Sequence, residues 1–508
     1  MEQFQISQHV VCVVTDKAPN MEKAVSLNES QDFKDLFKSL CPSYNLPARK
    51  TLGNTMLNIR YKELLGEVKA KVGKAKAICL TSDGWTDINE SFFAATAHYI
   101  NDADCTLHSF LLELGQFSKK HTSENIAAWL KTVMVNFGIS EKVCCVVTDN
   151  APNMKCAVNL LRIENITCFA HTLNIIVQNS IRDSMLDTVN SVKHIVSYFK
   201  KSSTALLKLH ELQKNMNYVE LKLILDVPTR WNSTVYMLER FHLNQEPIIS
   251  CLAILGISSG LEESDWIIMK EASTILKNFD LITKEMSAEK TITLPKMRVI
   301  VSLLINKLKS NLNSGDFGAK GVILLNLLLK GLLTRFQFLD NSTVSQATVL
   351  DPRFKHRGCK DNDTFKQCCD IILNEMTNLG STQEVTLMNE VLPNESVENA
   401  NSIWDEFDSE QNQPQLMLHT RSSFRIELDD YLSEALCHRN DDPLQWWKIH
   451  KMKYPTLYEL LLKKLCIPAS SVPCERIFSK AEDIETSKRN RLKANKINKI
   501  LFIKHNSS

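Results

Sequence analysis

The spacing of apolar residues predicts a small sheet domain in the first third of the chain. Three runs rich in β-branched and aromatic residues, 77–83, 92–100 and 106–114, are joined by short polar links and have the pattern of strands. A helical period follows at 123–136, and 143–148 is a continuous apolar run typical of a strand covered on both faces. This order of strands and helices predicts a mixed α/β sheet.

Helical periodicity dominates the rest of the chain, and changes of charge mark its boundaries. Between residues 367 and 420 there is no Lys or Arg but there are ten acids, whereas 488–504 holds seven Lys or Arg and no acid. Six segments are therefore expected: a partial repeat over 1–28, a helical lead-in over 29–76, the sheet domain over 77–184, a helical domain over 185–366, an acidic variable or disordered segment over 367–420, and a helical C-terminal region over 421–508.

One strand-plus-acid unit occurs twice. VVCVVTDKAPNMEKAV at 10–25 and VCCVVTDNAPNMKCAV at 143–158 share 12 of 16 residues. The second copy has neighbouring strands and the first has none, and a lone apolar strand cannot bury both of its faces. We interpret residues 1–28 as the remnant of a tandem copy or a misjoined exon, and expect their deletion to leave folding and dimerisation unchanged.

Composition narrows the class of protein. The net charge of +2 gives no whole-molecule argument for binding nucleic acid. The fifteen cysteines include no C-x-x-C pair, which favours reduced thiols in a cytosolic or nuclear protein and predicts no structural zinc. The N-terminus has no secretory signal pattern, and the most apolar helix is too short to cross a bilayer, so we expect no membrane partner.

Two aspartates end apolar strands and are the first candidates for chemistry. Asp83 in TSDGWTD and Asp149 in VVTDNAPNM each follow an apolar run and a threonine. If the two strands are parallel neighbours, both carboxylates project from one edge of the sheet, and a divalent cation would relieve their repulsion. Such a site can promote phosphodiester chemistry. The alternative is that both residues are turn or helix-capping residues.

Six motifs in a fixed order resemble hAT-type DNA transposases, and are most similar to derived proteins that usually carry an N-terminal BED zinc finger. They are CLTSDGWTDINESFFAATAHYI, VVTDNAPNM, CFAHTLNIIV, DVPTRWNST, LDPRFK and SSVPCERIFS…KRNRL. The resemblance implies an α/β ribonuclease-H-like domain interrupted by a large all-α insertion domain. A C-terminal helical hAT dimerisation region over 421–508 would complete the ribonuclease-H-like core. No BED finger is visible in the sequence, which leaves the recognised DNA site undefined.

The resemblance also implies roles for individual residues. Asp83, Asp149 and Glu475 match the family's three catalytic acids, which bind Mg²⁺ or Mn²⁺ and drive DNA strand cleavage and transfer. The positions that match DNA-contacting motifs are Cys168 and His171 of a C-x-x-H motif, Arg230 and Trp231 of an Arg-Trp pair, and Lys488, Arg489 and Arg491 of the closing basic run.

The residues themselves leave alternatives open for these roles. Cys168 and His171 lack two further zinc ligands, so a packed thiol and a hydrogen-bonded imidazole would explain them equally well. Trp231 suits either the core or stacking on an extruded base. Glu475 would also favour the positive end of its own helix, and the basic run would also suit a solvated face or a partner-facing helix.

Three functions remain as hypotheses. The first is a nuclear, DNA-binding protein derived from a hAT transposase, which dimerises through residues 421–508 and is a candidate transcription regulator. The second is an active metal-dependent transposase, and the third is a protein-interaction scaffold with a vestigial site. The sequence leaves open whether catalysis survives.

Overall fold

The computed structural model describes residues 50–86, 90–390, 423–484 and 494–507, with a few single residues between 35 and 48. The predicted remnant over 1–28 therefore lies outside the described residues. A helix over 423–433 is accompanied by these elements: η3 Thr51–Met56, α3 Leu57–Gly73, β1 Ile78–Thr86, β2 Ser91–Asn101, β3 Thr106–Gln116, α4 Ser123–Phe137, η4 Ser140–Lys142, β4 Val143–Thr148, α5 Pro152–Leu160, β5 Glu164–Thr167, α6 Phe169–Lys201, α7 Ser203–Asn215, α8 Trp231–His242, α9 Gln245–Ile254, α10 Glu263–Met286, α11 Lys296–Ser314, α12 Ala319–Arg335, η5 Gln337–Asp340, α13 Ser342–Leu350, η6 Lys355–Gly358, α14 Asn362–Glu390, α16 Pro443–His450, α17 Pro455–Lys464, α18 Val472–Ile484 and α19 Ala494–Asn506.

The five described strands form one mixed sheet in the order β3-β2-β1-β4-β5. β1 pairs antiparallel with β2 and parallel with β4, and β4 pairs parallel with β5. The four longer strands lie where the apolar pattern predicts them. The helix predicted over 123–136 forms as α4, and the Thr122 side chain caps it by accepting a hydrogen bond from Asn125 N.

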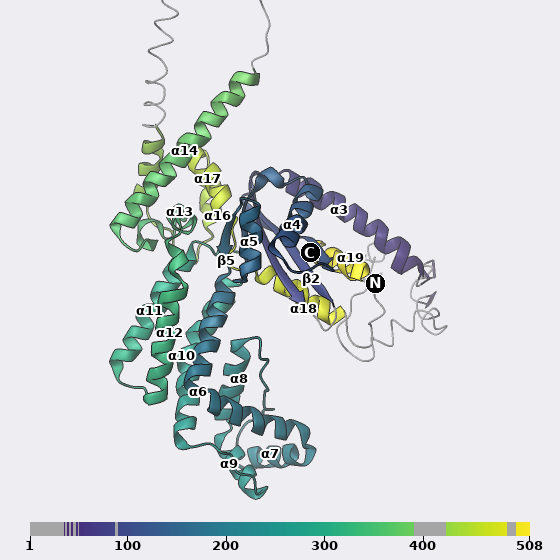
Figure 1. The fold of residues 1–508 in the computed structure, drawn as a ribbon, viewed down its shortest axis with the longest axis vertical. Coiled ribbons are helices and arrows are strands. Elements are labelled where there is room, and N and C mark those ends of the chain that lie inside the picture. Colours follow the sequence, from purple (N-terminus) through teal and green to yellow (C-terminus); the bar gives the residue numbers. More distant parts are fainter. Residues whose placement is uncertain are drawn as a thin grey trace, which may run out of the picture.

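Both faces of the inner strand β2 are buried, and alternate residues along it point to opposite sides of the sheet. Phe93 and Ala95 pack in the same apolar cluster as the buried faces of α3 and α4. Phe92 and Ala94 pack on the other face, in the cluster that contains the buried residues of α18 and α19. Figure 1 shows these two C-terminal helices, in yellow, beside the purple and blue strands. Residues almost 400 positions apart thus share one core.

The last helix is fixed to the outer strand of the sheet. The Asn506 side chain donates to Leu111 O and accepts from Leu111 N, both at 2.9 Å, so it pairs with the backbone of β3 as a neighbouring strand would. Leu501 is fully buried against the sheet. The alternative of a partner-facing helix therefore does not hold for this position of the basic run, because α19 buries Leu501 against its own chain. Ile497 and Phe502 are buried in the same way.

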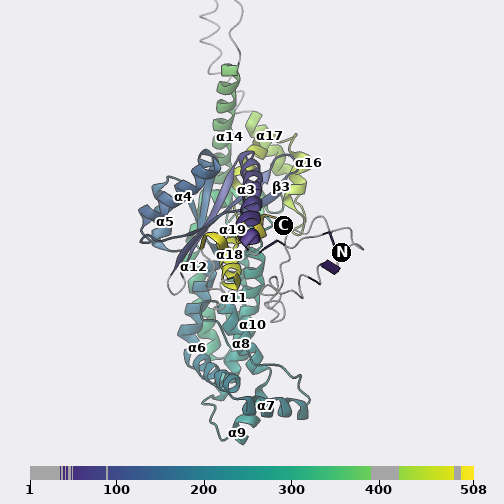
Figure 2. The same ribbon diagram turned by 90° about the vertical axis from the view of Figure 1, so that its right-hand side faces the viewer.

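The helices α6 to α12, called here the helical arm, extend from the sheet domain in the direction away from α14 (Figures 1 and 2). α6 begins beside the sheet and continues into the arm, and its backbone is kinked at Met185, where φ is −150°. The kink lies at the boundary that the sequence predicts between sheet and helical domains. One continuous apolar cluster nevertheless joins β4 and β5 to the arm.

The predicted start of the acidic segment at residue 367 does not coincide with the end of a helix. α14 runs from Asn362 to Glu390, so the boundary placed at residue 367 falls inside a helix. Cys368, Ile372 and Met376 are buried at four-residue intervals, which is the spacing of one helix face. This apolar face is what holds residues 367–380 in the fold despite their acidic neighbours. Residues 391–422 lie outside the described part of the chain.

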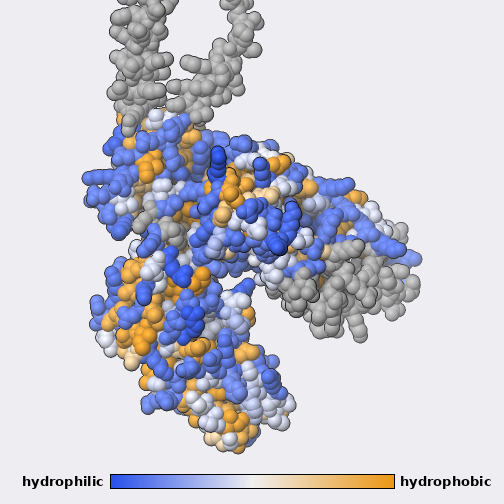
Figure 3. All heavy atoms as spheres, in the orientation of Figure 1, coloured by the Kyte–Doolittle hydropathy of each residue, from blue (hydrophilic) through white to orange (hydrophobic). Residues whose placement is uncertain are grey.

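Exposed apolar side chains are concentrated on the helical arm. Figure 3 shows hydrophobic residues over the part formed by α11 and α12, where Leu303, Ile323 and Leu333 are exposed. Among the described residues, no helix combines the length and the apolar character that a membrane crossing requires.

Candidate functional site

Asp83 and Asp149 lie side by side at one edge of the sheet. The parallel pairing of β1 with β4 ends at Ser82 opposite Thr148, and each aspartate is the next residue along its strand. The two carboxylates therefore lie side by side where the parallel pairing ends, at the usual ligand-binding edge of an α/β sheet. Asp149 follows the end of β4 as predicted, whereas β1 continues past Asp83 to Thr86 through its pairing with β2. Asp83 Oδ1 accepts a hydrogen bond from Gly84 N at 2.8 Å, and Asp149 Oδ1 accepts one from Ala151 N at 3.1 Å.

Glu475 is brought to the same edge by α18. Cys474, directly before it, is fully buried, and its Sγ lies 3.2 Å from Thr81 Oγ1 and 3.4 Å from Thr81 O on β1. The thiol thus fastens the first turn of α18 to the strand that carries Asp83. A side chain 392 positions further along the chain is positioned next to the aspartates in this way.

Burial and neighbouring acids raise the pKa of two of these carboxyl groups, Asp83 and Glu475. Burial raises the pKa of Asp83 well above its usual range, and the charges of Asp149 and Glu475 raise it further. Burial also raises the pKa of Glu475, while Arg230 and His171 oppose that rise. The structure therefore brings together five of the predicted site residues: three acids, one arginine and one histidine.

Cys168 has a structural role. Its side chain is fully buried and caps α6 by accepting a hydrogen bond from His171 N. The same sulfur accepts from Ser471 N at 3.3 Å, just before α18 begins. Burial raises the pKa of Cys168 to about 11, so the group stays a thiol at neutral pH. The expected contact of Cys168 with DNA is therefore wrong, and the packed-thiol alternative holds.

The Arg-Trp pair separates into an exposed and a buried residue. Arg230 is exposed and points toward α18, where its Nη2 lies 3.4 Å from Ser479 Oγ. Trp231 is only 2% exposed, and its backbone N donates to Asn174 Oδ1. A ring packed in this core is not available to stack on a base, so the core alternative holds for Trp231. Lys488, Arg489 and Arg491 lie outside the described residues.

The donor chemistry of the site fits a divalent cation. Three neighbouring carboxylates, two of them with raised pKa values, supply the hard oxygen ligands that Mg²⁺ and Mn²⁺ prefer. Within the described residues, no three His, Cys, Asp or Glu side chains form a ready-made metal-binding group. The carboxylates are thus close enough to interact without forming a closed set of ligands. Asp83 and Asp149 would hold the cation from the sheet, and Glu475 from α18.

Family models match three consecutive regions of this fold. The ZBED1 RNase-like domain matches residues 81–171, the ZBED1 RNase-like helical domain matches 166–274, and the hAT family C-terminal dimerisation region matches 427–507. The first contains Asp83 and Asp149, and the last contains Glu475. The chain belongs to the hAT transposase-derived proteins of the BED-finger type. Its RNase-like domain holds the sheet, and its matched helical domain includes α6 to α9.

Whole-chain relatives agree with this assignment. The chain is 24% identical to zinc finger BED domain-containing protein 4 of Homo sapiens, over 95% of this chain and 42% of that protein. It is 24% identical to the "Putative AC transposase" of Zea mays, over 93% of this chain and 62% of that protein. It is 22% identical to zinc finger BED domain-containing protein RICESLEEPER 1 of Oryza sativa subsp. japonica, over 87% of this chain and 66% of that protein. The chain therefore spans about half the length of the first two relatives.

A change of Asp83 to Asn is expected to stabilise the protein at neutral pH. Because the pKa of Asp83 is raised in the folded state, its charge opposes folding above that pKa, and this penalty disappears as the pH falls through it. Each pH unit between the pKa values of the folded and unfolded states corresponds to about 1.4 kcal/mol of unfolding free energy. Thermal unfolding should show Asp83→Asn melting a few degrees above wild type at pH 7.5, with the difference shrinking toward pH 4.

The same measurement tests cation binding without any assay of activity. Millimolar Mn²⁺ should raise the melting temperature of wild type at pH 7.5, because it binds only the folded site, and should raise that of Asp83→Asn much less. Asp187→Asn, on the exposed surface of α6, is the control and should behave as wild type. An Asp83→Asn protein that melts below wild type at pH 7.5 would contradict the prediction.

Proposed function

We propose that this chain binds DNA as a dimer in the nucleus, with the DNA strand passing the edge of the sheet where Asp83, Asp149 and Glu475 meet. The observation that carries the proposal is the position of Arg230 and His171 near Glu475, the acid that α18 brings to this edge. Arginine recognises phosphate, and acids at this edge suit a cation that a phosphate also contacts. A role as a transcription regulator would follow from DNA binding without cleavage.

Two exposed apolar side chains in the C-terminal region support the proposed dimer. Ile449 in α16 is 77% exposed and Met452, just after it, is 85% exposed. Both lie in the region that matches the hAT dimerisation model. Two large apolar side chains this close together and this exposed are unusual for a surface that faces only water. We propose that they lie in the dimer interface.

Placing charges at this surface is expected to break the dimer. Ile449→Asp with Met452→Asp should raise the dimer dissociation constant by about 10-fold or more, because burying an unpaired carboxylate is costly. Light scattering after size-exclusion chromatography measures the mass over a range of concentrations. Leu207→Asp is the matched control, because Leu207 is 68% exposed on α7, in the helical arm.

The same samples test DNA binding. Fluorescence anisotropy with a labelled duplex in EDTA should show binding that weakens steeply between about 50 and 200 mM salt. The double variant should bind more weakly than wild type because a dimer holds two DNA contacts at once. A wild-type chain that is monomeric at micromolar concentration, with no affinity for duplex DNA at low salt, would overturn the proposed function.

A second candidate function is metal-dependent cleavage of a DNA strand. The mutual repulsion of Asp83, Asp149 and Glu475 favours it, because a cap or turn residue has no need of two further acids. A bound divalent cation would supply an activated water and stabilise the leaving oxygen of a phosphodiester. The chain would contribute the three carboxylates that hold the site, and Arg230 and His171 would contact the negative charge of the strand.

A further inference from the structure

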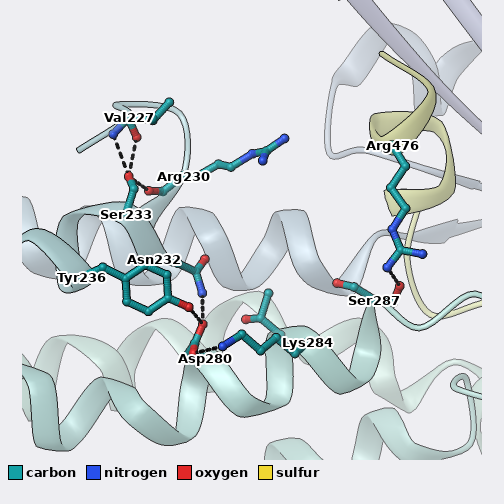
Figure 4. Close-up of a pocket in the computed structure, with 10 residues that line it drawn as sticks. Val227, Arg230, Asn232, Ser233, Tyr236, Asp280, Lys284, Ser287 and Arg476 are labelled. Atoms are coloured by element: carbon teal, nitrogen blue, oxygen red, sulfur yellow. Dashed lines mark hydrogen bonds and ion pairs between the residues drawn. The ribbon is translucent and has the colours of Figure 1, made fainter. Parts of the chain in front are cut away.

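A cleft of about 570 Å³ lies between α8, the end of α10 and the first turn of α18. Figure 4 shows Arg230 extending from the start of α8 toward α18, and Arg476 extending from α18 toward the end of α10. Lys284 reaches in from α10. Three cations from three separate parts of the chain thus meet in one cleft. Arg476 is the residue after Glu475, so the cleft adjoins the carboxylate site.

Asp280 is the one acid among the residues that line the cleft, and its carboxylate is bound by neighbouring side chains. Asp280 accepts hydrogen bonds from Asn232 Nδ2 at 2.5 Å and from Tyr236 OH at 2.7 Å. Lys284 Nζ forms an ion pair with it at 2.6 Å. Burial by itself would raise the pKa of Asp280, but these hydrogen bonds lower it. Lys284 is thus neutralised by Asp280, so the cleft can offer an anion the outward-facing donors of these cations and the charge of Arg230, which forms no ion pair within the described residues.

The two arginines are held in place at the mouth of the cleft. Arg476 donates to Ser287 O at 3.0 Å and pairs with Glu289 at 3.4 Å. Glu289 is itself fixed to the sheet domain, because Ser109 Oγ on β3 donates to it at 2.8 Å. Within the described part of the chain, Arg230 has no carboxylate partner in an ion pair, and its guanidinium makes one long hydrogen bond to α18. Its positive charge also lowers the pKa of the nearby Glu475, and an exposed guanidinium with further N–H donors is suited to an anionic ligand.

We propose that this cleft binds a backbone phosphate of the DNA strand. This phosphate would neighbour the one that contacts the cation held by the three carboxylates. The inference rests on the proposed function and extends it to Lys284 and Arg476. Planar guanidinium groups match the geometry of phosphate oxygens, and Lys284 adds a point charge. Tyr236 is not placed to read a base, since its hydroxyl is bound to Asp280 and Lys284 Nζ lies 5.6 Å above its ring. The contact therefore contributes affinity and position but no sequence preference.

The test measures DNA affinity in EDTA, so that no strand is cut. Full-length Lys284→Gln and Arg476→Gln are compared with wild type by fluorescence anisotropy, on a labelled single strand and on a duplex of the same sequence. Lys307→Gln is the matched control, because Lys307 is an exposed lysine on α11 outside the cleft. Lys284→Arg retains the charge and should retain the affinity. Melting temperatures establish that each variant is folded.

We expect each of the two Gln variants to bind several-fold more weakly than wild type at about 50 mM salt. The slope of log affinity against log salt should fall by about 0.7 for the single strand and about 0.9 for the duplex, which corresponds to one lost phosphate contact. Folded Gln variants with wild-type affinity and slope would overturn this inference and leave the proposed function standing. No DNA binding by wild type would instead overturn the proposed function itself. Equal losses in Lys307→Gln would show only a general charge effect, and that too would overturn the inference.

Discussion

Full-length Asp149→Asn is expected to lose the Mn²⁺-dependent nicking of supercoiled DNA that the second candidate function predicts for wild type. Asp149 and Asp83 lie side by side where the parallel pairing of β4 with β1 ends, and removing either would remove a ligand from the edge at which the three acids meet in the described structure. Loss of a partner in the outer shell of a metal site already costs about 10- to 100-fold in activity or affinity. A direct ligand should cost more than 100-fold, which corresponds to about 3 kcal/mol of barrier.

The control separates this activity from contaminating nucleases. Asp187→Asn, purified in the same way, should nick as wild type does, and Glu475→Gln should fail as Asp149→Asn does. DNA affinity in EDTA should be retained in all of these variants, because the carboxylates do not attract phosphate by themselves. Equal nicking by wild type and Asp149→Asn would remove the case for cleavage while leaving DNA binding intact.

The sheet and its two aspartates could be predicted from local pattern. Each strand has its own run of apolar residues, and Asp149 directly follows the end of β4 as predicted. The end of β1 could not be read in the same way, because pairing with β2 extends that strand past Asp83 to Thr86. The parallel register that places Asp83 next to Asp149 was the one assumption, and the structure confirms it. Glu475 could be connected to them only through the family resemblance, because nothing local indicates where α18 packs.

The remaining features depend on contacts between distant segments, which a single sequence does not reveal. Trp231 has the same local setting whether it is buried or exposed, and only packing of the arm decides. Cys168 resembles a metal ligand by spacing, but its sulfur accepts from Ser471 N, about 300 residues away. The cleft also forms between distant segments, so local pattern does not predict it. The one local indication is Arg476, a cation directly after Glu475 in the sequence.

The LDPRFK motif illustrates a sequence signal whose meaning is structural. Lys355 is fully buried, and its Nζ donates to the backbone carbonyls of Tyr431 and Glu434 at 2.6 Å, at the end of the helix over 423–433. Its Nζ also lies 4.6 Å from the centre of the Tyr431 ring. Burial lowers the pKa of Lys355, so the carbonyls and the ring are what stabilise its charged form. The motif thus fastens the region after α13 to the C-terminal region.

Arg353 completes that motif, and Arg353→Leu is expected to be strongly destabilising. Its side chain is 5% exposed and forms a two-pronged ion pair with Asp351, which is fully buried, at 2.9 and 2.6 Å. Removing one partner of a buried pair leaves an uncompensated charge and costs about 3–5 kcal/mol. Calorimetry should show a melting transition several degrees lower, whereas Arg357→Leu, on an exposed arginine of η6, should change little.

A double variant separates the contribution of the ion pair from the cost of the charge left behind. Asp351→Leu combined with Arg353→Leu removes both charges, so it should recover a substantial part of the stability lost in Arg353→Leu alone. Asp351 Oδ1 also accepts from Arg353 N at 3.0 Å, so recovery should be incomplete. Equal melting of Arg353→Leu and Arg357→Leu would contradict this account, because a stranded carboxylate would then carry no penalty. A double variant less stable than the single one would contradict it as well, because packing, and not the stranded carboxylate, would then dominate the loss.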